Sequence, residues 1–320
     1  MIIVLFSLFF DLESGFSLCY KRTMKCGFTA IIGRPNVGKS TLLNQILEQK
    51  IVIATNKAQT TRKRIKGIYT TDDVQIIFVD TPGIHKPLNK LGEFLLDEAK
   101  VSVPDADVVL FLVDVSTPAG KGDKWIVENV LKNVKAPVIM VLNKTDKASP
   151  KKIDENIISY RELYPDFSSV VRISAKTGKN KSKLVDEIIK YLPQGEMLYP
   201  EDVVTEENMR SITEEIIREK ILVNTSDEIP HSVAVRVEEY KEDSNIDRIQ
   251  ATIFCETKSQ KGILIGKGGS LLKLIGTQAR QDLERIVEKK VFLGLQVKVE
   301  KDWRKKDNIL KNFGYVSVSE

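Results

Sequence analysis

The sequence predicts two domains: a doubly wound α/β domain with a mostly parallel sheet, followed by a smaller α+β domain. Up to about residue 192, short apolar runs rich in Val, Ile and Phe alternate with amphipathic stretches. Parallel strands that are covered by helices on both faces have this pattern. After residue 232 the period changes to apolar–polar alternation, which is typical of half-buried strands. A chain of 320 residues is long enough to bury two separate cores.

Five apolar runs are expected to form the strands of the first domain: FTAIIG, VQIIFVD, VVLFLVD, APVIMVLNK and SSVVRISA. At their carboxyl ends these runs carry Gly33, Asp80, Asp114, Asn143 and Ser174. The carboxyl ends of parallel strands meet at one edge of an open α/β sheet, where ligands bind. We therefore expect the ligand site of this domain at that edge.

The segment GRPNVGKS at residues 33–40 matches a phosphate-binding loop and lies between a predicted strand and a predicted helix. Its glycines let backbone N–H groups wrap around phosphate oxygens, next to a helix N-terminus that favours anions. Lys39 supplies a positive charge to the β- and γ-phosphates, and Ser40 offers its hydroxyl to Mg²⁺. The predicted nucleotide contacts of this segment are Asn36, Val37, Gly38, Lys39, Ser40 and Thr41.

The segment DTPG at the end of the second run predicts the γ-phosphate side of the site. Asp80 is placed to hold a water molecule bound to Mg²⁺. The N–H of Gly83 can reach the γ-phosphate because no side chain obstructs it. A simple Pro-Gly turn after a strand is the alternative interpretation of this segment taken alone.

Two later motifs predict recognition of guanine. The carboxylate of Asp146 can accept hydrogen bonds from N1–H and the 2-amino group of guanine, a pair that adenine lacks. Lys144 can lay its aliphatic stem on the base, and Asn143 would connect this loop to the phosphate loop. The last motif comprises Ser174, Ala175 and Lys176, of which Ala175 can offer its N–H to the guanine O6. Because all the motifs occur in order at strand ends, the sequence predicts a guanine-nucleotide site.

A threonine of the segment AQTTR is expected to complete the Mg²⁺ coordination with GTP bound and to be released after hydrolysis. Thr61 is the predicted ligand because it directly precedes Arg62, and Thr60 is the alternative. Ile84 follows Gly83 where Ras-like enzymes have a glutamine that orients water, so slow intrinsic hydrolysis is expected. The predicted metal ligands are Ser40, Thr61 and Asp80, and the predicted catalytic residues are Lys39, Thr61, Asp80 and Gly83.

A break in the pattern separates the two predicted domains, which are residues 24–193 and residues 208–316. The intervening residues 194–207 are expected to be a linker, because LPQGEMLYPED contains two prolines and a glycine. A helix is expected over residues 208–223. Alternating residues then predict strands at 233–237, 249–255 and 295–299, in an antiparallel or mixed sheet.

The helical region between the second and third of these strands is interrupted by GKGG at residues 266–269. KH domains clamp the backbone of about four RNA nucleotides with a GXXG loop of this kind. Residues 258–320 carry 14 basic and 7 acidic groups, whereas residues 195–257 carry 6 basic and 16 acidic groups. The loop thus lies in a positively charged segment, after two alternating strands and before a third, which favours a KH domain over a plain helix–turn–helix. The predicted RNA contacts are Ile265, Gly266, Lys267, Gly268, Gly269 and Lys273.

The first ten residues, MIIVLFSLFF, are apolar but too few to span a bilayer, and they lack the basic start of a signal peptide. We interpret residues 1–23 as an extension that is not native, with translation from Met24, and a membrane-touching N-terminus is the alternative. The three cysteines and two histidines have no ligand-like spacing. This spacing argues against a zinc site or a disulfide framework and favours a reducing, cytoplasmic setting.

Together these features resemble the Era family of bacterial GTPases over about residues 25–316. Besides the nucleotide motifs, the resemblance rests on AQTTR, DTPGIHKP, YPED…T, IREK…EIPHSVAV, KGILIGKGGS and KDWR. It implies an α/β P-loop GTPase domain of the TrmE–Era–EngA type, followed by an α+β type-II KH domain. Ile84 also fits the family pattern, and only the first 23 residues depart from it.

The resemblance also implies a function that spacing alone could not show. Era proteins bind the 3′ end of 16S rRNA through the KH domain, assist assembly of the 30S ribosomal subunit, and alternate between GTP- and GDP-bound conformations. We expect a monomer with Mg²⁺ as cofactor, cytoplasmic or peripheral on the inner membrane. Related GTPases bind potassium at the position of Asn36, so acceleration by K⁺ is a hypothesis. The alternative function is a GTP-gated RNA tether in which hydrolysis is only a slow reset.

Overall fold

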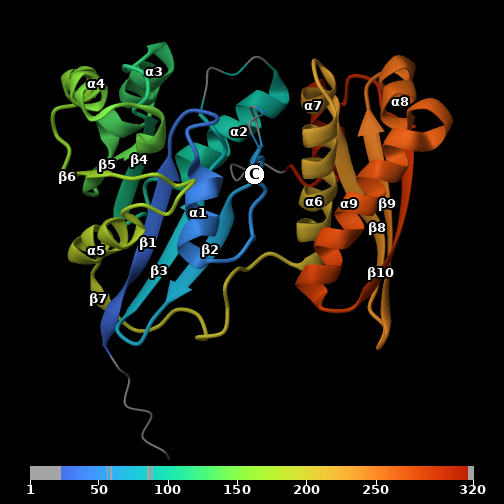
Figure 1. The fold of residues 1–320 in the computed structure, drawn as a ribbon, viewed down its shortest axis with the longest axis horizontal. Coiled ribbons are helices and arrows are strands. Elements are labelled where there is room, and N and C mark those ends of the chain that lie inside the picture. The colour runs from blue at the N-terminus through green and yellow to red at the C-terminus, as the bar shows by residue number, and fades with distance from the viewer. Residues whose placement is uncertain (1–22, 56, 58–59, 85–86, 88, 316–320) are drawn as a thin grey trace, which may run out of the picture.

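Residues 23–55, 57, 60–84, 87 and 89–315 are described by the structure, which is a computed structural model (Figure 1). Some of the predictions fall on residues outside these ranges. These are the interpretation of residues 1–22, the motif residues Ala58, Gln59, His85 and Lys86, and the end of the second domain at residue 316.

The first domain is built on a sheet with the strand order β2-β3-β1-β4-β5-β6, and its five predicted runs are all strands. Neighbouring strands from β3 to β6 are parallel, which confirms the predicted doubly wound α/β fold. These strands are β1 (Met24–Ile32), β3 (Val74–Asp80), β4 (Val108–Asp114), β5 (Val138–Asn143) and β6 (Ser169–Arg172).

Two strands of this sheet were not predicted. The edge strand β2 (Ile65–Thr70) pairs antiparallel with β3, and the two-residue β7 (Gln194–Gly195) pairs antiparallel with the start of β1. The segment IKGIYT of β2 contains a glycine and lacks the continuous apolar run of a central strand. The predicted linker lies along the free edge of β2, where the N–H of Ile68 donates to the carbonyl of Val204 at 2.8 Å.

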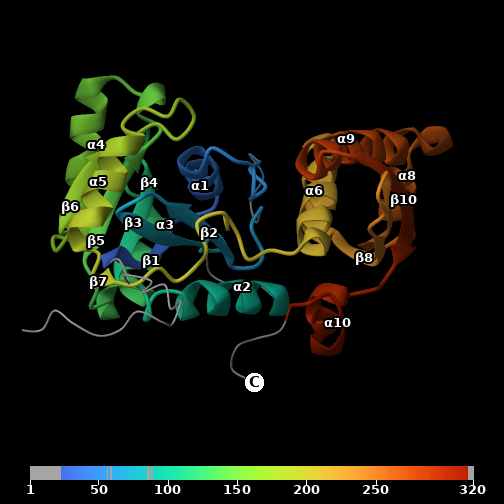
Figure 2. The ribbon, with the colours of Figure 1, turned by 90° about the horizontal axis from the view of Figure 1, so that it is seen from below.

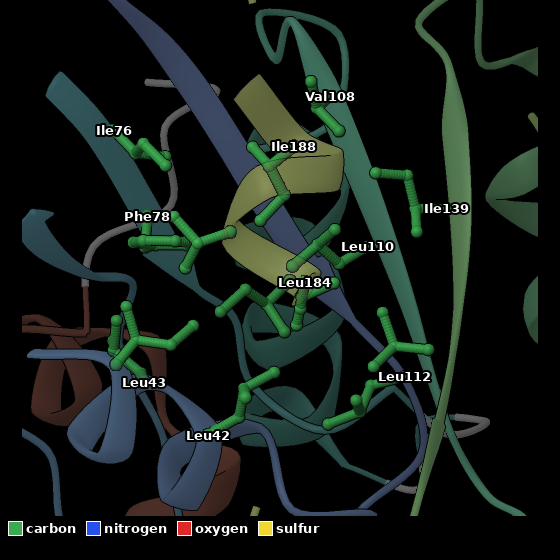
Figure 3. Packing of buried hydrophobic residues seen from close by; sticks show 14 of the residues in the cluster. Leu42, Leu43, Ile76, Phe78, Val108, Leu110, Leu112, Ile139, Leu184 and Ile188 are labelled. Atoms are coloured by element: carbon green, nitrogen blue, oxygen red, sulfur yellow. The ribbon is translucent and has the colours of Figure 1, made fainter. Parts of the chain in front are cut away.

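Helices cover both faces of the sheet because strand residues alternate between two cores. Leu110 of β4 belongs to the core under α1 and α5, whereas its neighbour Phe111 belongs to the core under α2, α3 and α4. Figure 3 shows Leu184 and Ile188 of α5 beside Leu110, with Leu42 and Leu43 of α1 in the same cluster. The helices are α1 (Lys39–Leu47), α2 (Lys90–Val101), α3 (Lys121–Asn129), α4 (Pro150–Leu163) and α5 (Lys181–Tyr191).

The second domain has a three-stranded mixed sheet of order β10-β9-β8, which confirms the predicted α+β class. The strands β8 (Ala234–Lys241) and β9 (Ile246–Cys255) are antiparallel, and β10 (Lys290–Val299) is parallel to β9. A single core joins this sheet to the helices α6, α8 and α9. The helices are α6 (Met209–Asn224), α7 (Ile229–Ser232), α8 (Lys258–Ile265), α9 (Ser270–Val287) and α10 (Asp307–Asn312).

The two domains contact each other through α2 and the C-terminal segment of the chain. Leu91, Phe94 and Leu95 of α2 pack against side chains from the region around α10. Figure 2 shows α10 beside one end of α2. The residues of this cluster in the second domain are Ala234, Phe254, Trp303, Leu310, Phe313 and Tyr315. Because α2 follows the DTPG segment in the chain, this apolar contact connects the nucleotide side of the molecule to the second domain.

Candidate functional site

A cavity of about 200 Å³ lies at the carboxyl edge of the first sheet. Its lining comes from five separate segments of the chain, as expected for the loops that follow parallel strands. Three predicted residues, Val37, Asp80 and Ser174, do not line the cavity but support residues that do. The predicted residues in the lining are Asn36, Gly38, Lys39, Ser40, Thr41, Thr61, Gly83, Asn143, Lys144, Asp146, Ala175 and Lys176.

The phosphate-binding loop turns between the end of β1 and the start of α1. Gly38 has a φ of 105°, and a Cβ atom there would lie 2.4 Å from Nδ2 of Asn143. Only glycine therefore fits this position. The ammonium group of Lys39 is buried inside the loop, where it donates to the carbonyls of Gly33 and Arg34 at 3.3 Å each. Burial lowers the pKa of Lys39, and the negative charge of Asp80 opposes this effect.

Three oxygen-bearing side chains meet beside this lysine. Oγ of Ser40 donates to Oδ2 of Asp80 at 2.8 Å, and Oγ1 of Thr61 donates to the same oxygen at 3.2 Å. The two hydroxyl oxygens are 2.9 Å apart. The structure thus brings together the three residues that the sequence predicts as metal ligands, from α1, the segment before β2, and the end of β3.

The carboxylate of Asp80 has one oxygen without a hydrogen-bond partner among the described residues. Its Oδ1 is buried and accepts no hydrogen bond within the described part of the chain. Burial raises the pKa of Asp80, while the charge of Lys39 and the hydrogen bonds from Ser40 and Thr61 act in the opposite direction. A buried carboxylate oxygen costs free energy unless it is paired, and an all-oxygen set suits Mg²⁺. The residues present therefore fit this ion.

The alternative switch residue, Thr60, points elsewhere. Its hydroxyl donates to the carbonyl of Lys57 at 2.7 Å and lies 2.8 Å from Oγ1 of Thr55. These bonds lie within its own segment, away from Asp80. The geometry therefore separates the two candidates that the sequence left open, with Thr61 toward Ser40 and Thr60 away from it.

Gly83 and Ile84 differ in what they face. A Cβ atom at Gly83 would lie 2.8 Å from Cα of Pro35, so the DTPG segment lies directly against the phosphate-binding loop. The N–H of Ile84 donates to the carbonyl of Gly33 at 3.2 Å. The side chain of Ile84 is only 2% exposed and packs in the core with Ala30. It is therefore directed into the protein and does not line the cavity.

Asn143 connects two loops at the end of the cavity that is predicted to bind the base. Its Nδ2 donates to the carbonyl of Val37 at 2.7 Å, and its Oδ1 accepts from the N–H of Ala175 at 2.8 Å. The first bond agrees with the predicted connection to the phosphate-binding loop. The second differs from expectation, since the sequence assigned this N–H to the guanine O6. In the structure the buried amide of Asn143 takes it, because both of its polar atoms need partners.

Two carboxylates at this end of the cavity have side-chain partners: Asp114 pairs with Lys144, and Asp146 accepts from Ser174. Oδ2 of Asp114 lies 2.7 Å from Nζ of Lys144, which also donates to the carbonyl of Asn36 at 2.6 Å. Oδ1 of Asp146 accepts from Oγ of Ser174 at 2.6 Å. This hydrogen bond is the main cause that lowers the pKa of Asp146, so the carboxylate is ionised and ready to accept.

Sequence reasoning missed three residues that shape this site. Asp114 was noted as a strand end but given no role, although its strand-end position was a signal for it. Arg34 forms an ion pair at 2.8 Å with Asp123 of α3, which anchors the loop from outside. The side chain of Arg62, the residue after Thr61, extends into the second domain. The roles of Arg34 and Arg62 could not be predicted from neighbouring residues, because their partners are 89 and 171 residues away in the chain.

The predicted RNA loop joins α8 to α9. Gly266, Gly268 and Gly269 have φ values of 73°, 60° and 81°, a region that other residues rarely adopt. Lys267 lies at the tip of the loop. A groove of about 380 Å³ continues from Gly269 between α9 and β10 and is lined by Lys273. Among the flanking apolar residues, Leu264 and Ile275 are buried in the core, whereas Ile263 and Leu274 are 51% and 44% exposed.

The described residues contain neither a cluster of metal-binding side chains nor a membrane-spanning helix. No group of three or more His, Cys, Asp or Glu side chains in these ranges has the geometry to hold a metal ion by itself. No helix within the same ranges is both long and apolar enough to cross a membrane. Cys26 and Cys255 are both free thiols in the interior.

Models of known protein families match the segments of the chain that carry the cavity and the glycine loop. The model of a family described as "50S ribosome-binding GTPase" matches residues 28–144, and that of the KH domain matches residues 228–304. The chain is 49% identical over 292 residues to the GTPase Era of Clostridium perfringens (strain 13 / Type A). This similarity covers 91% of this chain and 98% of the relative.

Two solved structures have a closely similar fold. A crystal structure of Era in complex with MgGDPNP and nucleotides 1506–1542 of 16S ribosomal RNA is 43% identical, with a TM-score of 0.89. The match covers 92% of this chain and 99% of that chain. A crystal structure of a variant of Era from Aquifex aeolicus, bound to GDP·AlF4⁻, is 42% identical with a TM-score of 0.88. That match covers 92% and 100% of the two chains.

Proposed function

The chain belongs to the Era family of GTPases, and from this premise we propose that its nucleotide state controls RNA binding by its KH domain. The proposed partner is the 3′ end of 16S rRNA, and the proposed process is assembly of the 30S ribosomal subunit. The observation that carries the proposal is the meeting of phosphate-, metal- and base-binding groups in one cavity of a chain that also carries the glycine loop.

The phosphate end of the cavity supports binding of GTP with Mg²⁺. Lys39 would exchange its long contacts with backbone carbonyls for phosphate oxygens, which are stronger acceptors for an ammonium group. Ser40 and Thr61 would hold the ion through their hydroxyls, and Asp80 through a water molecule. When bound, the ion neutralises charge on the β- and γ-phosphates.

The other end of the cavity supports selection of guanine. The Ser174 hydroxyl orients the Asp146 carboxylate and leaves its second oxygen for the base. Lys144 is held along the cavity wall by Asp114, so its stem can lie on the base plane. An adenine base would leave the charged carboxylate without its two donors, which is a large penalty for a polar group that must desolvate.

The chain is a GTPase, and we propose that its intrinsic rate is slow. The side chain after Gly83 lies in the core, so it cannot orient an attacking water as a glutamine does in Ras. Any acceleration would come from a partner, from the backbone of the switch segments, or from a K⁺ ion near Asn36. Equal hydrolysis rates in potassium and sodium buffers would exclude the last of these sources.

The glycine loop supports contact with an RNA backbone. A phosphate can approach Gly268 and Gly269 closely, because even a Cβ atom added at either position would meet nothing within 4 Å. Lys267 supplies positive charge at the same point, and exposed Ile263 and Leu274 flank the loop. KH domains combine such a loop with apolar groups that contact unpaired bases.

The test compares crosslinking of the full-length protein to an oligonucleotide of the 16S rRNA 3′ end in the presence of a GTP analogue or GDP. Gly268→Asp introduces a residue that can adopt the positive φ of this position but carries a negative charge. RNA crosslinks should therefore be lost while GTP binding is retained. Gly262→Ala in α8, where an added Cβ meets nothing, is the matched control. Crosslinks that are equal with both nucleotides would break the proposed control of RNA binding.

The tether alternative differs only in whether turnover matters. The buried Ile84, which leaves no water-orienting side chain, is the observation in its favour. A variant that binds GTP but does not hydrolyse it separates the two: normal ribosome maturation would favour the tether, and arrested maturation would favour the switch. A monomeric state, a cytoplasmic location and peripheral contact with the inner membrane stay predictions.

A further inference from the structure

Three consecutive residues, Thr60, Thr61 and Arg62, connect the candidate magnesium site to the second domain. The hydroxyl of Thr61 lies among Ser40 and Asp80, as described above. The side chain of the next residue, Arg62, leaves the first domain altogether. Adjacent Cα atoms are about 3.8 Å apart, so a displacement of Arg62 cannot leave Thr61 in place without distorting the backbone.

Arg62 is anchored deep in the second domain. The residue is 1% exposed, and its guanidinium donates from Nη1 to the carbonyl of Val233 at 2.7 Å and to the hydroxyl of Tyr315 at 3.3 Å. Nη2 donates to the carbonyl of Pro230 at 3.5 Å, and the group lies 5.7 Å from the ring centroid of Trp303. All four partners belong to the second domain.

The chemistry of this anchor makes it sensitive to the position of the second domain. An arginine keeps its charge in proteins, and a buried charge is costly without partners. Among the described residues, Arg62 forms no hydrogen bond with a carboxylate, so carbonyl and hydroxyl oxygens and the face of an indole carry its stabilisation. A shift of the second domain would remove these partners together.

The second domain also holds the other side of Thr61. Arg218 of α6, whose side chain is fully buried, donates to the carbonyl of Thr60. Glu219, the next residue of α6, accepts from the N–H of Ala54 at 3.4 Å and from Nζ of Lys50 at 2.6 Å. The stretch that leads to the switch threonine is thus bonded to α6 near its start and at Thr60, in addition to the anchor of Arg62.

We propose that Arg62 is a positioning residue for GTP hydrolysis. Its guanidinium, fixed by the second domain, keeps the hydroxyl of Thr61 next to Ser40 and Asp80. The RNA-binding domain thereby becomes part of the machinery that assembles the magnesium site. This inference rests on the proposed role of Thr61 as a ligand of Mg²⁺.

The first test uses Arg62→Met, which keeps an apolar stem and removes the charge and the donors. Arg64→Met is the matched control, because Arg64 lies two residues on and pairs with Glu98 of the first domain instead. In single-turnover experiments Arg62→Met should hydrolyse GTP at least about 10-fold more slowly and require more Mg²⁺ for half-maximal rate. Its affinity for GDP should stay within about 2-fold of the wild type, because the switch threonine is a contact of the GTP state.

A double-mutant cycle tests whether Arg62 acts through Thr61. In the background of Thr61→Ala, the change Arg62→Met should slow hydrolysis no further, because the hydroxyl that it positions is already gone. Additive losses would overturn the proposal. So would an Arg62→Met protein that hydrolyses GTP as fast as Arg64→Met. If Thr61→Ala alone leaves hydrolysis unchanged, the proposed role of Thr61 fails instead.

A milder variant covers the case in which Arg62→Met does not fold. Tyr315→Phe removes only the hydroxyl that accepts from Arg62 and keeps the ring packed between Phe94 and Trp303. We expect a smaller loss of hydrolysis in the same direction, with a higher Mg²⁺ requirement and an unchanged melting temperature. Wild-type hydrolysis and Mg²⁺ dependence in a folded Tyr315→Phe protein, together with wild-type rates in any folded Arg62 variant, would refute the anchor.

Discussion

The hydroxyl oxygens of Ser40 and Thr61 lie 2.9 Å apart although 21 residues separate them in the chain. This contact places the segment before β2 against the start of α1, with Asp80 as the shared acceptor. It also distinguishes Thr61, which the sequence predicted as the ligand, from Thr60, which it left as the alternative. The hydroxyl of Thr60, one residue earlier, forms its hydrogen bonds with Thr55 and Lys57.

The two threonines provide their own matched pair of variants. Thr61→Ala should slow single-turnover GTP hydrolysis by about 10-fold or more and reduce the preference for GTP over GDP. Thr60→Ala should stay within about 2-fold of the wild type in both measurements, since its hydroxyl serves only its own segment. Equal losses in the two variants would contradict the geometry.

Asp146→Asn should weaken GTP binding by at least about 100-fold, because an amide group would meet the N–H donors of guanine with its own donor. The hydrogen bond with Ser174 can persist in this variant, so the fold should be unaffected. Titration calorimetry with GTP and ATP measures the change. Asp154→Asn, which alters a carboxylate on the surface of α4, should bind like the wild type. An unchanged preference for GTP in Asp146→Asn would remove Asp146 from base recognition.

Asp114→Asn should weaken the binding of GTP and GDP equally, by roughly 3- to 10-fold, because Lys144 loses its charged partner while the phosphate end is untouched. The expected loss of affinity is modest because the ion pair between Asp114 and Lys144 is partly exposed. Fluorescent GTP and GDP analogues report both affinities. Asp105→Asn, an exposed carboxylate just before the same strand, is the control. A loss confined to GTP would show that Asp114 acts on the γ-phosphate instead.

Ile84→Ala should lower the free energy of unfolding by about 2–5 kcal/mol, because it removes buried methyl groups and leaves a cavity. Hydrolysis per folded molecule should change little, since the side chain does not reach the nucleotide cavity. Urea unfolding and single-turnover kinetics at low temperature separate the two effects. Ile158→Ala, at a position that is 59% exposed, should change stability by no more than about 0.5 kcal/mol. A faster Ile84→Ala enzyme would indicate that the side chain restrains catalysis.

We expect His231 to make the stability of the second domain depend on pH. Burial lowers the pKa of His231 from 6.5, and the positive charges of Arg62, Arg304 and Lys57 lower it further. The negative charge of Glu228 acts in the opposite direction. The unfolded state therefore binds this proton first, so stability should fall as the pH drops through 6.5 toward the lower pKa of the folded state.

His231→Asn should lack this component of the pH dependence. The urea midpoint of the wild type should decrease more than that of the variant between pH 7.5 and pH 5.5. The difference between the two proteins isolates His231 from the other groups that titrate in this range. Parallel decreases in the two proteins would assign the pH dependence to those groups.

The order of the motifs was enough to predict the nucleotide site. Gly38, Asp80 and Asn143 belong to segments that follow or end predicted parallel strands, and such segments must converge on one edge of the sheet. The glycine loop at residues 266–269 was predictable for a similar reason, because it interrupts a helical pattern between two alternating strands. In both cases the function depends on backbone conformations that only particular residues adopt.

Other features were not predictable because their causes are long-range contacts. The edge strand β2 forms through pairing with β3 and is covered by the linker, so its own sequence carries a weak signal. The N–H of Ala175 is taken by Asn143 across 32 residues. The burial of Ile84 depends on how the DTPG segment lies against the sheet.

The sequence by itself determined the fold class, the guanine-nucleotide motifs and the glycine loop, because each follows from local periodicity, glycine conformation and strand-end placement. Only the tertiary structure decided that Thr61 rather than Thr60 faces Ser40, and that Arg62 is buried in the second domain. These outcomes depend on which surfaces the two domains bring together. A pattern of neighbouring residues does not contain that information, since a hydrogen bond across 171 residues leaves no local trace.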